Sequence, residues 1–494
     1  METVSATPLL AVLVSAFAGV LILFSRRLPA LRESWTFIAA FIKFGLVASL
    51  YPLVKDGGTV IFTLTDFLPD APLFFRVDSL GLTFALLSSF LWLVTSVYSV
   101  GYVRALKEHA QTRYYFSFAL SLSAALGIAF AGDLVTFFIF YELLTLATYP
   151  LVAHKENQEA LKAARKYLVY SLSAGGLMLL AIAWTYLETG STAFASGGFL
   201  AGQFDARFLG VLFFLFIYGC GVKASLFPVH AWLPSAMVAP VPVSALLHAV
   251  AVVKAGVFGV LRITGYVFGP DLLHSTRLSE PLAAIAAFTL LGASIIALAQ
   301  DNLKRRLAYS TISQLSYIIL GAALLTPTAM TGAVLHLVNH AFLKITLFFC
   351  AGIIYVQAHK ENISDLRGLG RKMPLTFILF GVGSLGLAGF PPMSGFISKW
   401  FLCQGAVDTG MTIFLTVYLI SSLLNLAYFV PVLISAFLPV PAGQKEPEVH
   451  AQNWQLLIPA CITASLGLAF GCVPGLVLSQ YGLAAEAAKK VFGG

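Results

Sequence analysis

Apolar runs of about 20 residues recur along the whole chain of 494 residues and constrain the fold more than any other feature. A helix of that length crosses the roughly 30 Å of hydrocarbon in a bilayer. Only 11% of the residues are charged, whereas about a quarter are charged in soluble domains. The sequence therefore predicts an all-α membrane protein with about fourteen transmembrane helices. We place these spans at 5–25, 33–54, 78–100, 114–131, 133–153, 165–187, 207–228, 240–264, 280–299, 307–325, 330–357, 374–397, 411–437 and 454–479.

Lysine and arginine are distributed unevenly between alternate predicted loops. One side holds most of them, chiefly within 26–32, 104–113, 155–162, 304–306 and 360–372. The other side holds little beyond Lys55, Arg207, Arg277, Lys489 and Lys490. The positive-inside rule makes the first side cytoplasmic and both termini external, in a multi-pass protein of the inner (plasma) membrane. We therefore expect the net charge of +8 to set topology and not to bind nucleic acid.

Two predicted spans, the seventh and the twelfth, are interrupted by proline at comparable places. Each has a lysine, Lys223 or Lys399, within about two helical turns of the break. Transporters build ion sites from paired broken helices in inverted repeats. We therefore predict two inverted five-helix repeats, spans 4–8 and 9–13, although ordinary proline kinks are the alternative. The prolines at the predicted breaks are Pro228, Pro234, Pro391 and Pro392. The expected segments are 1–113 with three helices, 114–264 and 265–437 as the repeats, and 438–494 as a C-terminal loop and helix.

Five ionisable side chains fall inside the predicted spans. They are Glu142, Lys223, Lys254, Lys344 and Lys399. Each charge at the bilayer centre costs roughly 3 kcal/mol, so five unpaired charges would oppose folding by roughly 15 kcal/mol. These groups must pair, hydrate or titrate, and membrane proteins that keep such groups usually move ions with them. The sequence thus predicts a path for protons or other cations.

Glu142 lies in the middle of an apolar span, and Lys223 is its expected partner. Desolvation favours the neutral form of a carboxyl group, whereas a nearby lysine favours its charged form. Asp133, near the start of the same span, is interpreted as a helix cap or surface group. Lys43 is expected to extend to the membrane interface.

Lys254 is flanked by apolar residues, and burial without a counter-charge lets an amine gain and lose a proton. His248 precedes it by six residues, so a water would have to connect the two. His336, His340 and Lys344 follow one another at four-residue steps and share a helix face, which suits a proton wire. Metal binding by the two histidines lacks a third ligand in H-E-x-x-H spacing, and the five cysteines show no C-x-x-C spacing. No metal site is therefore predicted.

The motifs together resemble the antiporter-like subunits of respiratory complex I, Mrp-type Na+/H+ antiporters and membrane-bound hydrogenases. The resemblance covers about residues 75–440. It is carried by the Glu142 helix and by residues 221–234, 239–244, 254–256, 301–310, 340–344 and 391–399. It implies fourteen helices, inverted repeats with broken seventh and twelfth helices, and a hydrated charged axis in the membrane plane.

Position by position, the resemblance assigns Glu142 and Lys223 to the coupled ion pair, Lys254 and Lys344 to central relay lysines, and Lys399 to the terminal lysine. It also matches His248, His336 and His340 to histidines of the largest complex I member. The chain length, Lys254 and the run Pro391–Gly395 look most like the MrpD type of antiporter protein or hydrogenase relatives. A proton-pumping subunit of a complex I-like NADH:quinone oxidoreductase or of a hydrogenase is the alternative.

No motif for NAD, flavin, iron–sulfur cluster or quinone is found, so no cofactor is expected, and any enzyme activity would belong to a whole complex. The expected partners are other membrane subunits, the lipid bilayer and H+, with Na+ left open as a second ion. Two rival hypotheses are a stand-alone solute transporter and an inert membrane anchor. The first predicts transport by the chain alone, and the second predicts unchanged ion flux in Lys223→Ala and Lys399→Ala.

Overall fold

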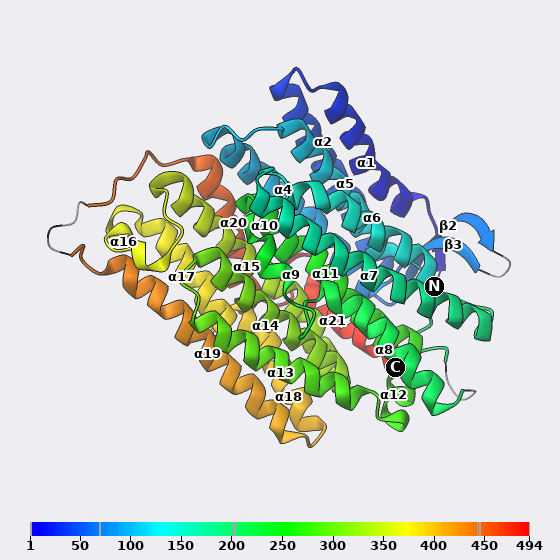
Figure 1. Cartoon of the computed structure of the whole chain (residues 1–494). Helices are drawn as coiled ribbons and strands as arrows, with labels where there is room; N and C mark the ends of the chain where they lie inside the picture. The colour runs from blue at the N-terminus through cyan, green and yellow to red at the C-terminus, as the bar shows by residue number, and fades with distance from the viewer. Residues whose placement is uncertain (1, 69–70, 201–203, 442, 444–445, 494) are drawn as a thin grey trace.

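The computed structural model describes residues 2–68, 71–200, 204–441, 443 and 446–493, with the backbone alone at 66–68, 71, 248 and 476–478. Nearly all of this chain is helical, and the long helices run side by side in one bundle (Figure 1). Helices α1 and α2 lie along one edge of the bundle, and α19 lies along the opposite edge (Figure 1). The prediction of a helical multi-span membrane protein is confirmed.

The first segment contains three long helices and a small sheet that the sequence did not predict. Its helices are α1 (Thr7–Phe24), α2 (Pro29–Ser49), α3 (Tyr51–Val54) and α4 (Ser79–Ala105). Its strands are β1 (Glu2–Val4), β2 (Thr59–Leu68) and β3 (Ala71–Val77). β1 pairs with β2 in parallel and β2 with β3 antiparallel, so the order is β1-β2-β3. The β-branched and aromatic residues of 59–77 favour strands, but their alternation was hidden by the polar positions among them.

The middle of the chain contains long helices interrupted by short ones. Its elements are α5 (Gln111–Phe130), α6 (Leu134–Val152), α7 (Gln158–Thr189), α8 (Ala206–Lys223), α9 (Trp232–Ser235), the 3₁₀ turn η1 (Ala236–Val238), α10 (Val241–Ala245), the π-helical turn η2 (Leu246–Val250), α11 (Val252–Arg262), the π-helical turn η3 (Ile263–Phe268) and α12 (Pro270–Thr276). π-helical turns within a helix are rare and concentrate at functional sites. Two of them flank α11, the helix that carries Lys254.

The remaining chain repeats the alternation of long and broken helices. Its elements are α13 (Ser279–Leu298), α14 (Leu303–Ala323), α15 (Pro327–Ala358), the 3₁₀ turn η4 (Ile363–Asp365), α16 (Leu369–Lys372), α17 (Pro374–Ala388), α18 (Ser394–Asp408), α19 (Thr412–Phe437), α20 (Trp454–Cys472) and α21 (Leu476–Val491). The last predicted span, 454–479, is therefore too long: α20 ends at Cys472, and a separate helix follows it. α21 packs against α4 and α15.

Within the described residues, eleven helices are long and apolar enough to cross a membrane, or twelve if the pair Val252–Phe268 and Pro270–Thr276, bent by 83°, is one span. Two predicted spans fall short for physical reasons. Span 307–325 coincides with α14, whose polar side chains lower its hydropathy. Span 374–397 is divided into α17 and the start of α18, each a helix of 15 residues. The number fourteen and the inverted repeats stay predictions.

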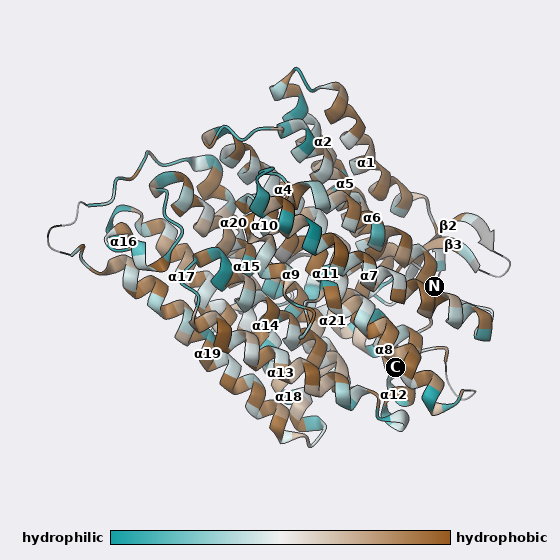
Figure 2. Ribbon diagram, in the orientation of Figure 1, coloured by the Kyte–Doolittle hydropathy of each residue, from teal (hydrophilic) through white to brown (hydrophobic). Residues whose placement is uncertain are grey.

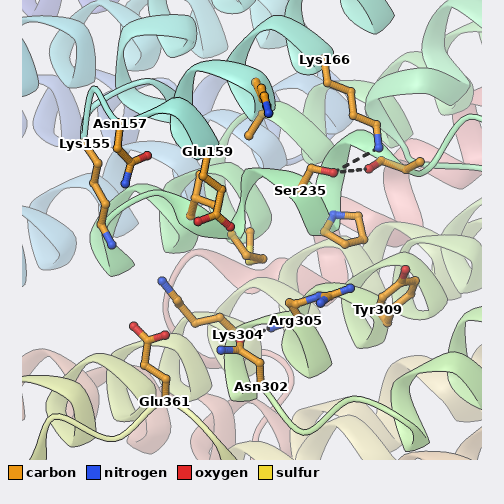
Figure 3. A pocket seen from close by; sticks show the side chains of 16 residues that line it. Lys155, Asn157, Glu159, Lys166, Ser235, Asn302, Lys304, Arg305, Tyr309 and Glu361 are labelled. Atoms are coloured by element: carbon orange, nitrogen blue, oxygen red, sulfur yellow. Dashed lines mark hydrogen bonds between the residues drawn. The ribbon is translucent and has the colours of Figure 1, made fainter.

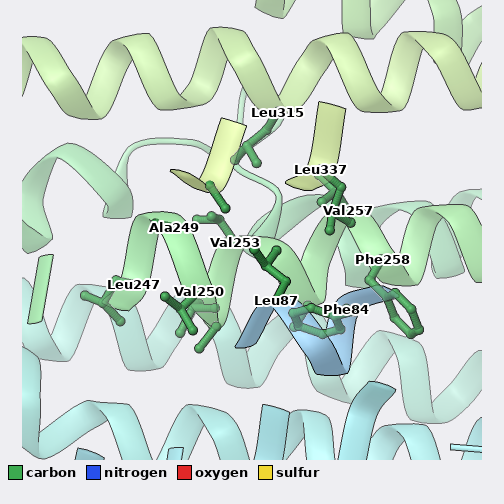
Figure 4. Packing of buried hydrophobic residues seen from close by; sticks show 14 of the residues in the cluster. Phe84, Leu87, Leu247, Ala249, Val250, Val253, Val257, Phe258, Leu315 and Leu337 are labelled. Atoms are coloured by element: carbon green, nitrogen blue, oxygen red, sulfur yellow. The ribbon is translucent and has the colours of Figure 1, made fainter. Parts of the chain in front are cut away.

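Helix α15 is the centre of the bundle. Its most apolar 18-residue window is entirely buried, whereas the corresponding windows of α1, α2 and α19 are less than half buried. Apolar residues cover the outer helices, and hydrophilic residues gather in the connecting segments near α10 and α16 (Figure 2). Around α11, aliphatic and aromatic side chains from α4, α14 and α15 fill the interior, among them Phe84, Val253, Leu315 and Leu337 (Figure 4). Polar groups of the interior are thus set in a close-packed apolar surround.

The basic segments predicted to share one side lie together at one end of the bundle. Arg32 donates to Gln111, Arg113 contacts Glu156, and the backbone nitrogen of Leu303 donates to the carbonyl of Glu361. We call this the basic end. The chain termini lie at the other end of α4, where Glu2 and Lys490 line one cavity of 180 Å³ together with Asp78. Both termini therefore lie at the same end of the bundle (Figure 1).

The interpretation of Lys43 as an interfacial residue is wrong. Its side chain is fully buried, and its amine donates to Ser15 Oγ at 2.5 Å and to the Leu122 carbonyl at 3.0 Å. The amine also lies 5.1 Å from the centre of the Trp92 ring. α2 packs with this face against α4 and α5, so the amine has no route to the interface and is satisfied inside the protein.

Candidate functional site

Glu142 is positioned by α6, which begins at a buried cap. The Asp133 side chain accepts from the Thr136 backbone nitrogen at 2.8 Å and caps the helix, but it is buried and is not a surface group. Glu142 is half-buried, and neither carboxylate oxygen has a hydrogen-bond partner among the described residues. A buried carboxylate without partners is costly, so this group is held for a purpose other than stability.

Gly175 of α7 provides the space that the Glu142 carboxylate occupies. A Cβ at position 175 would lie 2.4 Å from Glu142 Oε1, which is closer than van der Waals contact allows. The neighbouring Gly176 has open space where a Cβ would be placed. The two adjacent glycines thus differ in one respect, the proximity of the carboxylate.

We expect Gly175→Ala to displace the Glu142 carboxylate without unfolding the protein, because a flexible carboxylate can move away at low cost. Ion translocation should fall by about tenfold, because a displacement of about 1 Å at a reacting group can cost more than that. The measurement is the rate of proton movement in membrane vesicles at matched protein levels, with Gly176→Ala as the control. Equal rates in the two variants would contradict the placement.

Lys223 is the last residue of α8 and is fully buried. Its amine donates to the backbone carbonyl of Tyr141 and lies 3.4 Å from the centre of the Tyr141 ring. The predicted pair with Glu142 is therefore not a direct one: no ion pair within 4 Å joins the two described side chains. The lysine instead contacts the residue next to Glu142, so it feels the charge of the carboxylate without binding it.

The chain breaks directly after Lys223. Residues 224–231 are not helical in the hydrogen-bonded α sense, and the short helix α9 follows. Pro228 lies in this break, whereas Pro234 lies within α9. The indole of Trp232 donates to the Val222 carbonyl at 2.7 Å, and Thr289 accepts from the Phe227 backbone nitrogen at 3.1 Å. Side chains thus satisfy backbone groups that the break leaves open.

Lys254 joins the two halves of the chain. Its buried amine lies 2.8 Å from His340 Nδ1 and donates to the Leu337 carbonyl at 2.7 Å, and both partners belong to α15. Its helix also approaches the end of α8 closely, since a Cβ at Gly256 would lie 2.3 Å from the backbone nitrogen of Ala224. The side chain of His248 lies outside the described residues.

The three residues predicted to share a face of α15 are all fully buried. His336 Nδ1 lies 2.9 Å from Ser398 Oγ, and its Nε2 lies 2.9 Å from Gln314 Oε1. The ring centres of His336 and His340 are 6.1 Å apart. Lys344 turns toward α14, where its amine donates to Ser310 Oγ at 2.8 Å. The stripe therefore contacts α11, α14 and α18 through different members.

Lys399 lies beyond the second break. α17 ends at Ala388, Pro391 and Pro392 lie between the helices, and α18 begins at Ser394. The Lys399 amine donates to Ser422 Oγ at 3.0 Å and to the Ala388 carbonyl at 3.3 Å. It also lies 4.5 Å from the centre of the Tyr317 ring, which is 5.3 Å from the ring centre of His336. The chain thus places Lys399 close to His336 through Tyr317 and Ser398.

Sequence reasoning missed the uncharged members of this cluster. They include Tyr141, Ser310, Gln314, Tyr317, Ser398, Ser422 and Tyr428, and the Tyr428 hydroxyl donates to Ser310 Oγ at 3.0 Å. Polar positions in α14 carried a usable signal, because Ser310, Gln314 and Tyr317 recur at three- and four-residue steps.

A second missed feature is a buried ion pair near the termini. Arg262 donates to Asp78 through Nη1 at 2.5 Å and through Nη2 at 2.8 Å, and the two side chains are 2% and 7% exposed. Asp78 also caps α4 by accepting from the Gly81 backbone nitrogen at 2.8 Å. This bidentate pair ties α4 to α11 and differs from the lysines, which have no such carboxylate partner among the described residues.

A cavity of 580 Å³ opens at the basic end against α9, the short helix beyond Lys223. Its lining is polar, with Lys155, Glu159, Lys166, Lys304 and Glu361 around its walls (Figure 3). Lys166 donates to Ser235 Oγ at 3.2 Å, which joins α7 to α9. Charged walls of both signs favour water, so the cavity brings solvent close to the first break.

Residues 131–425 match the family described as NADH:quinone oxidoreductase/Mrp antiporter, transmembrane. NADH-quinone oxidoreductase subunit N of Desulforudis audaxviator is 35% identical over 391 residues, which is 78% of this chain and 77% of that protein. A protein of Rhizobium meliloti described as a probable K+/H+ antiporter A/B subunit is 33% identical over 377 residues. This match covers 75% of this chain and 37% of that protein, so the chain spans about a third of the antiporter protein's length.

Two solved structures share the fold. The Mrp complex of Dietzia superposes with a TM-score of 0.88 at 24% identity, over 98% of this chain and 99% of the compared chain. The archaeal membrane-bound sulfane sulfur reductase superposes with a TM-score of 0.89 at 24% identity, over 99% and 98%. With the extent of the family match and the 35% identity to a subunit N, the chain belongs to the NADH:quinone oxidoreductase/Mrp antiporter family and is an antiporter-like membrane subunit.

Proposed function

We propose that this chain translocates protons as one subunit of a multisubunit membrane complex. The observation that carries the proposal is the contact between Lys254 and His340, 2.8 Å apart, which links α11 to the stripe on α15. Four lysines are buried, and none lies within 4 Å of a carboxylate among the described ion pairs. Structural lysines in a membrane interior pair with acids, whereas amines that keep only hydroxyl, carbonyl and imidazole partners suit proton exchange.

The proposed path follows these contacts. Water from the cavity at the basic end reaches Lys223, where the nearby Glu142 charge favours loading of the amine. The proton passes to Lys254 and then to His340, since imidazole accepts at one nitrogen and releases at the other. His336 and Tyr317 continue the path to Lys399. Lys344 and Ser310 form a side branch that adjusts the charge near the centre.

Energy for this movement comes from outside the chain. Moving one charge against 100 mV costs about 2.3 kcal/mol, and no buried group described here supplies it. A partner subunit or a counter-ion gradient must do so. The proposed location is the inner membrane, with the basic end in the cytoplasm and the termini outside.

For the parent complex we propose the Mrp type, with this chain most like MrpD and with Na+ exchanged for H+. The support is the fold shared with an Mrp complex and the likeness to antiporter subunits. A redox-driven complex is the second candidate, favoured by the 35% identity to NADH-quinone oxidoreductase subunit N. In that case the chain pumps protons for an electron-transfer reaction carried out by other subunits.

One experiment separates the two parents. Inverted vesicles from cells that produce the whole complex are loaded with a pH-sensitive dye, and NaCl or an electron donor is added. A Na+-dependent pH change that is lost in Lys223→Ala supports the Mrp-type assignment. A pH change that needs the electron donor and is lost in Lys223→Ala supports the redox-driven assignment. Full ion movement in Lys223→Ala under both conditions would overturn the proposed function itself.

A further inference from the structure

A cluster of metal-ligating side chains lies at the basic end, away from the buried lysines. Glu108 and His109 belong to the loop between α4 and α5, and His154 belongs to the loop between α6 and α7. One ligand atom from each residue lies within 4.8 Å of the other two. His154 is 12 residues beyond Glu142, or about 18 Å along a helix, so the cluster is separate from the proposed proton path.

His154 is the most informative member. It is 1% exposed, yet neither ring nitrogen has a hydrogen-bond partner among the described residues. Its Nε2 lies 3.5 Å from Glu108 Oε2, and its ring centre lies 4.8 Å from that of His109. Buried imidazoles normally satisfy at least one nitrogen, so this ring is oriented toward a ligand that would occupy the space between the three side chains.

The backbone around the cluster is held firmly. Arg113 contacts the Glu156 carboxylate and donates to the His154 carbonyl at 3.2 Å. The backbone nitrogen of Glu108 donates to the Val103 carbonyl at 3.0 Å. The Tyr114 ring packs edge-on against His154, with ring centres 5.6 Å apart. Both loops are therefore fixed before any ligand arrives, which lowers the ordering cost of binding.

We propose that Glu108, His109 and His154 bind a divalent transition metal ion of the Zn2+ class. Two imidazoles and one carboxylate are a known ligand set for Zn2+, and a water completes four-coordination. In tetrahedral Zn2+ sites with bonds of about 2.1 Å, ligand atoms lie about 3.4 Å apart. The pair Glu108–His154 already has this spacing, and the half-exposed His109 closes the remainder by a side-chain rotation of about 1 Å.

The metal would join two loops that are far apart in sequence. One follows α4 and precedes α5, and the other follows α6, the helix of Glu142, and precedes α7. A bond to each loop would hold the ends of four helices together at the basic end. Glu156, 3.9 Å from His109 Nε2, is engaged by Arg113 and balances the added charge.

The test uses the purified complex without a histidine tag, with ZnCl2 and CoCl2 as probes. Titration against a competing chelator should show one tight Zn2+ site in the unmodified protein, and bound Co2+ should give the absorption of a tetrahedral nitrogen and oxygen site. His109→Ala and Glu108→Gln should each weaken Zn2+ binding by at least about tenfold. Both changes alter partly exposed side chains, so folding should be preserved.

His274→Ala is the matched control, because His274 is an exposed histidine of α12 outside the cluster. This control should keep the Zn2+ affinity of the unmodified protein. Absence of tight Zn2+ binding in the unmodified protein would overturn the proposal, as would equal binding in His109→Ala and the unmodified protein. Neither readout depends on ion movement, so the result is independent of the proposed function.

Discussion

Replacement of Lys254 by methionine should reduce proton translocation by about a hundredfold or more, because proton transfer by a positioned side chain contributes that much to rate. Methionine keeps the length of the side chain but removes the amine that lies 2.8 Å from His340 Nδ1. The Leu337 carbonyl that loses this donor belongs to the continuous helix α15, so the fold should persist. The measurement is the initial rate of pH change in inverted vesicles, normalised to assembled complex.

Lys55→Met is the matched control for that experiment. Lys55 is an exposed lysine after α3, and it contacts only the neighbouring Asp56 at 3.8 Å among the described ion pairs. The same chemical change at this position should leave the rate within about twofold of the unmodified protein, because exposed ion pairs contribute little. A Lys254→Met complex that assembles normally and moves protons at the control rate would contradict the proposed path.

Asp78→Asn should destabilise the protein by about 3–5 kcal/mol, because it leaves the Arg262 guanidinium buried without a counter-charge. Asparagine can still accept from the Gly81 backbone nitrogen, so the change removes the charge and keeps the cap of α4. The measurement is the free energy of unfolding in mixed micelles, followed by tryptophan fluorescence.

The double variant Asp78→Asn with Arg262→Met serves as the control for charge. Replacing both partners of a buried ion pair by uncharged side chains is often nearly neutral, so most of the lost stability should return. If the single variant lost less than about 1 kcal/mol, or if the double variant were the less stable of the two, the pair would not be the buried clamp described here.

Charged residues in apolar runs were the part of the site that sequence could reveal. Lys223, Lys254, Lys344 and Lys399 stand out because a charge among apolar neighbours is costly in a membrane, and the structure buries all four. Their roles stay predictions. Their partners are serine, tyrosine, glutamine and backbone carbonyls, which are common in membrane helices and carry no comparable signal.

Contacts between distant segments were beyond the reach of periodicity. Asp78 and Arg262 are 184 residues apart, and each looked like a helix end when read alone. Lys43 was misplaced for the same reason, since its partners Ser15 and Leu122 belong to other helices. Spacing motifs for metal sites describe ligands that are neighbours in sequence, so they do not reveal a histidine from one loop opposite two ligands from another. Helix packing, not local sequence, determines such pairs.

The position of the two chain ends restricts how often the polypeptide can traverse the bilayer. Glu2 and Lys490 line one cavity, so the chain enters and leaves the bundle on the same side. A thread that starts and finishes on one side must cross an even number of times. Eleven passages are therefore impossible, while twelve or fourteen both satisfy parity, and at least one helix outside the eleven long apolar ones must complete a passage.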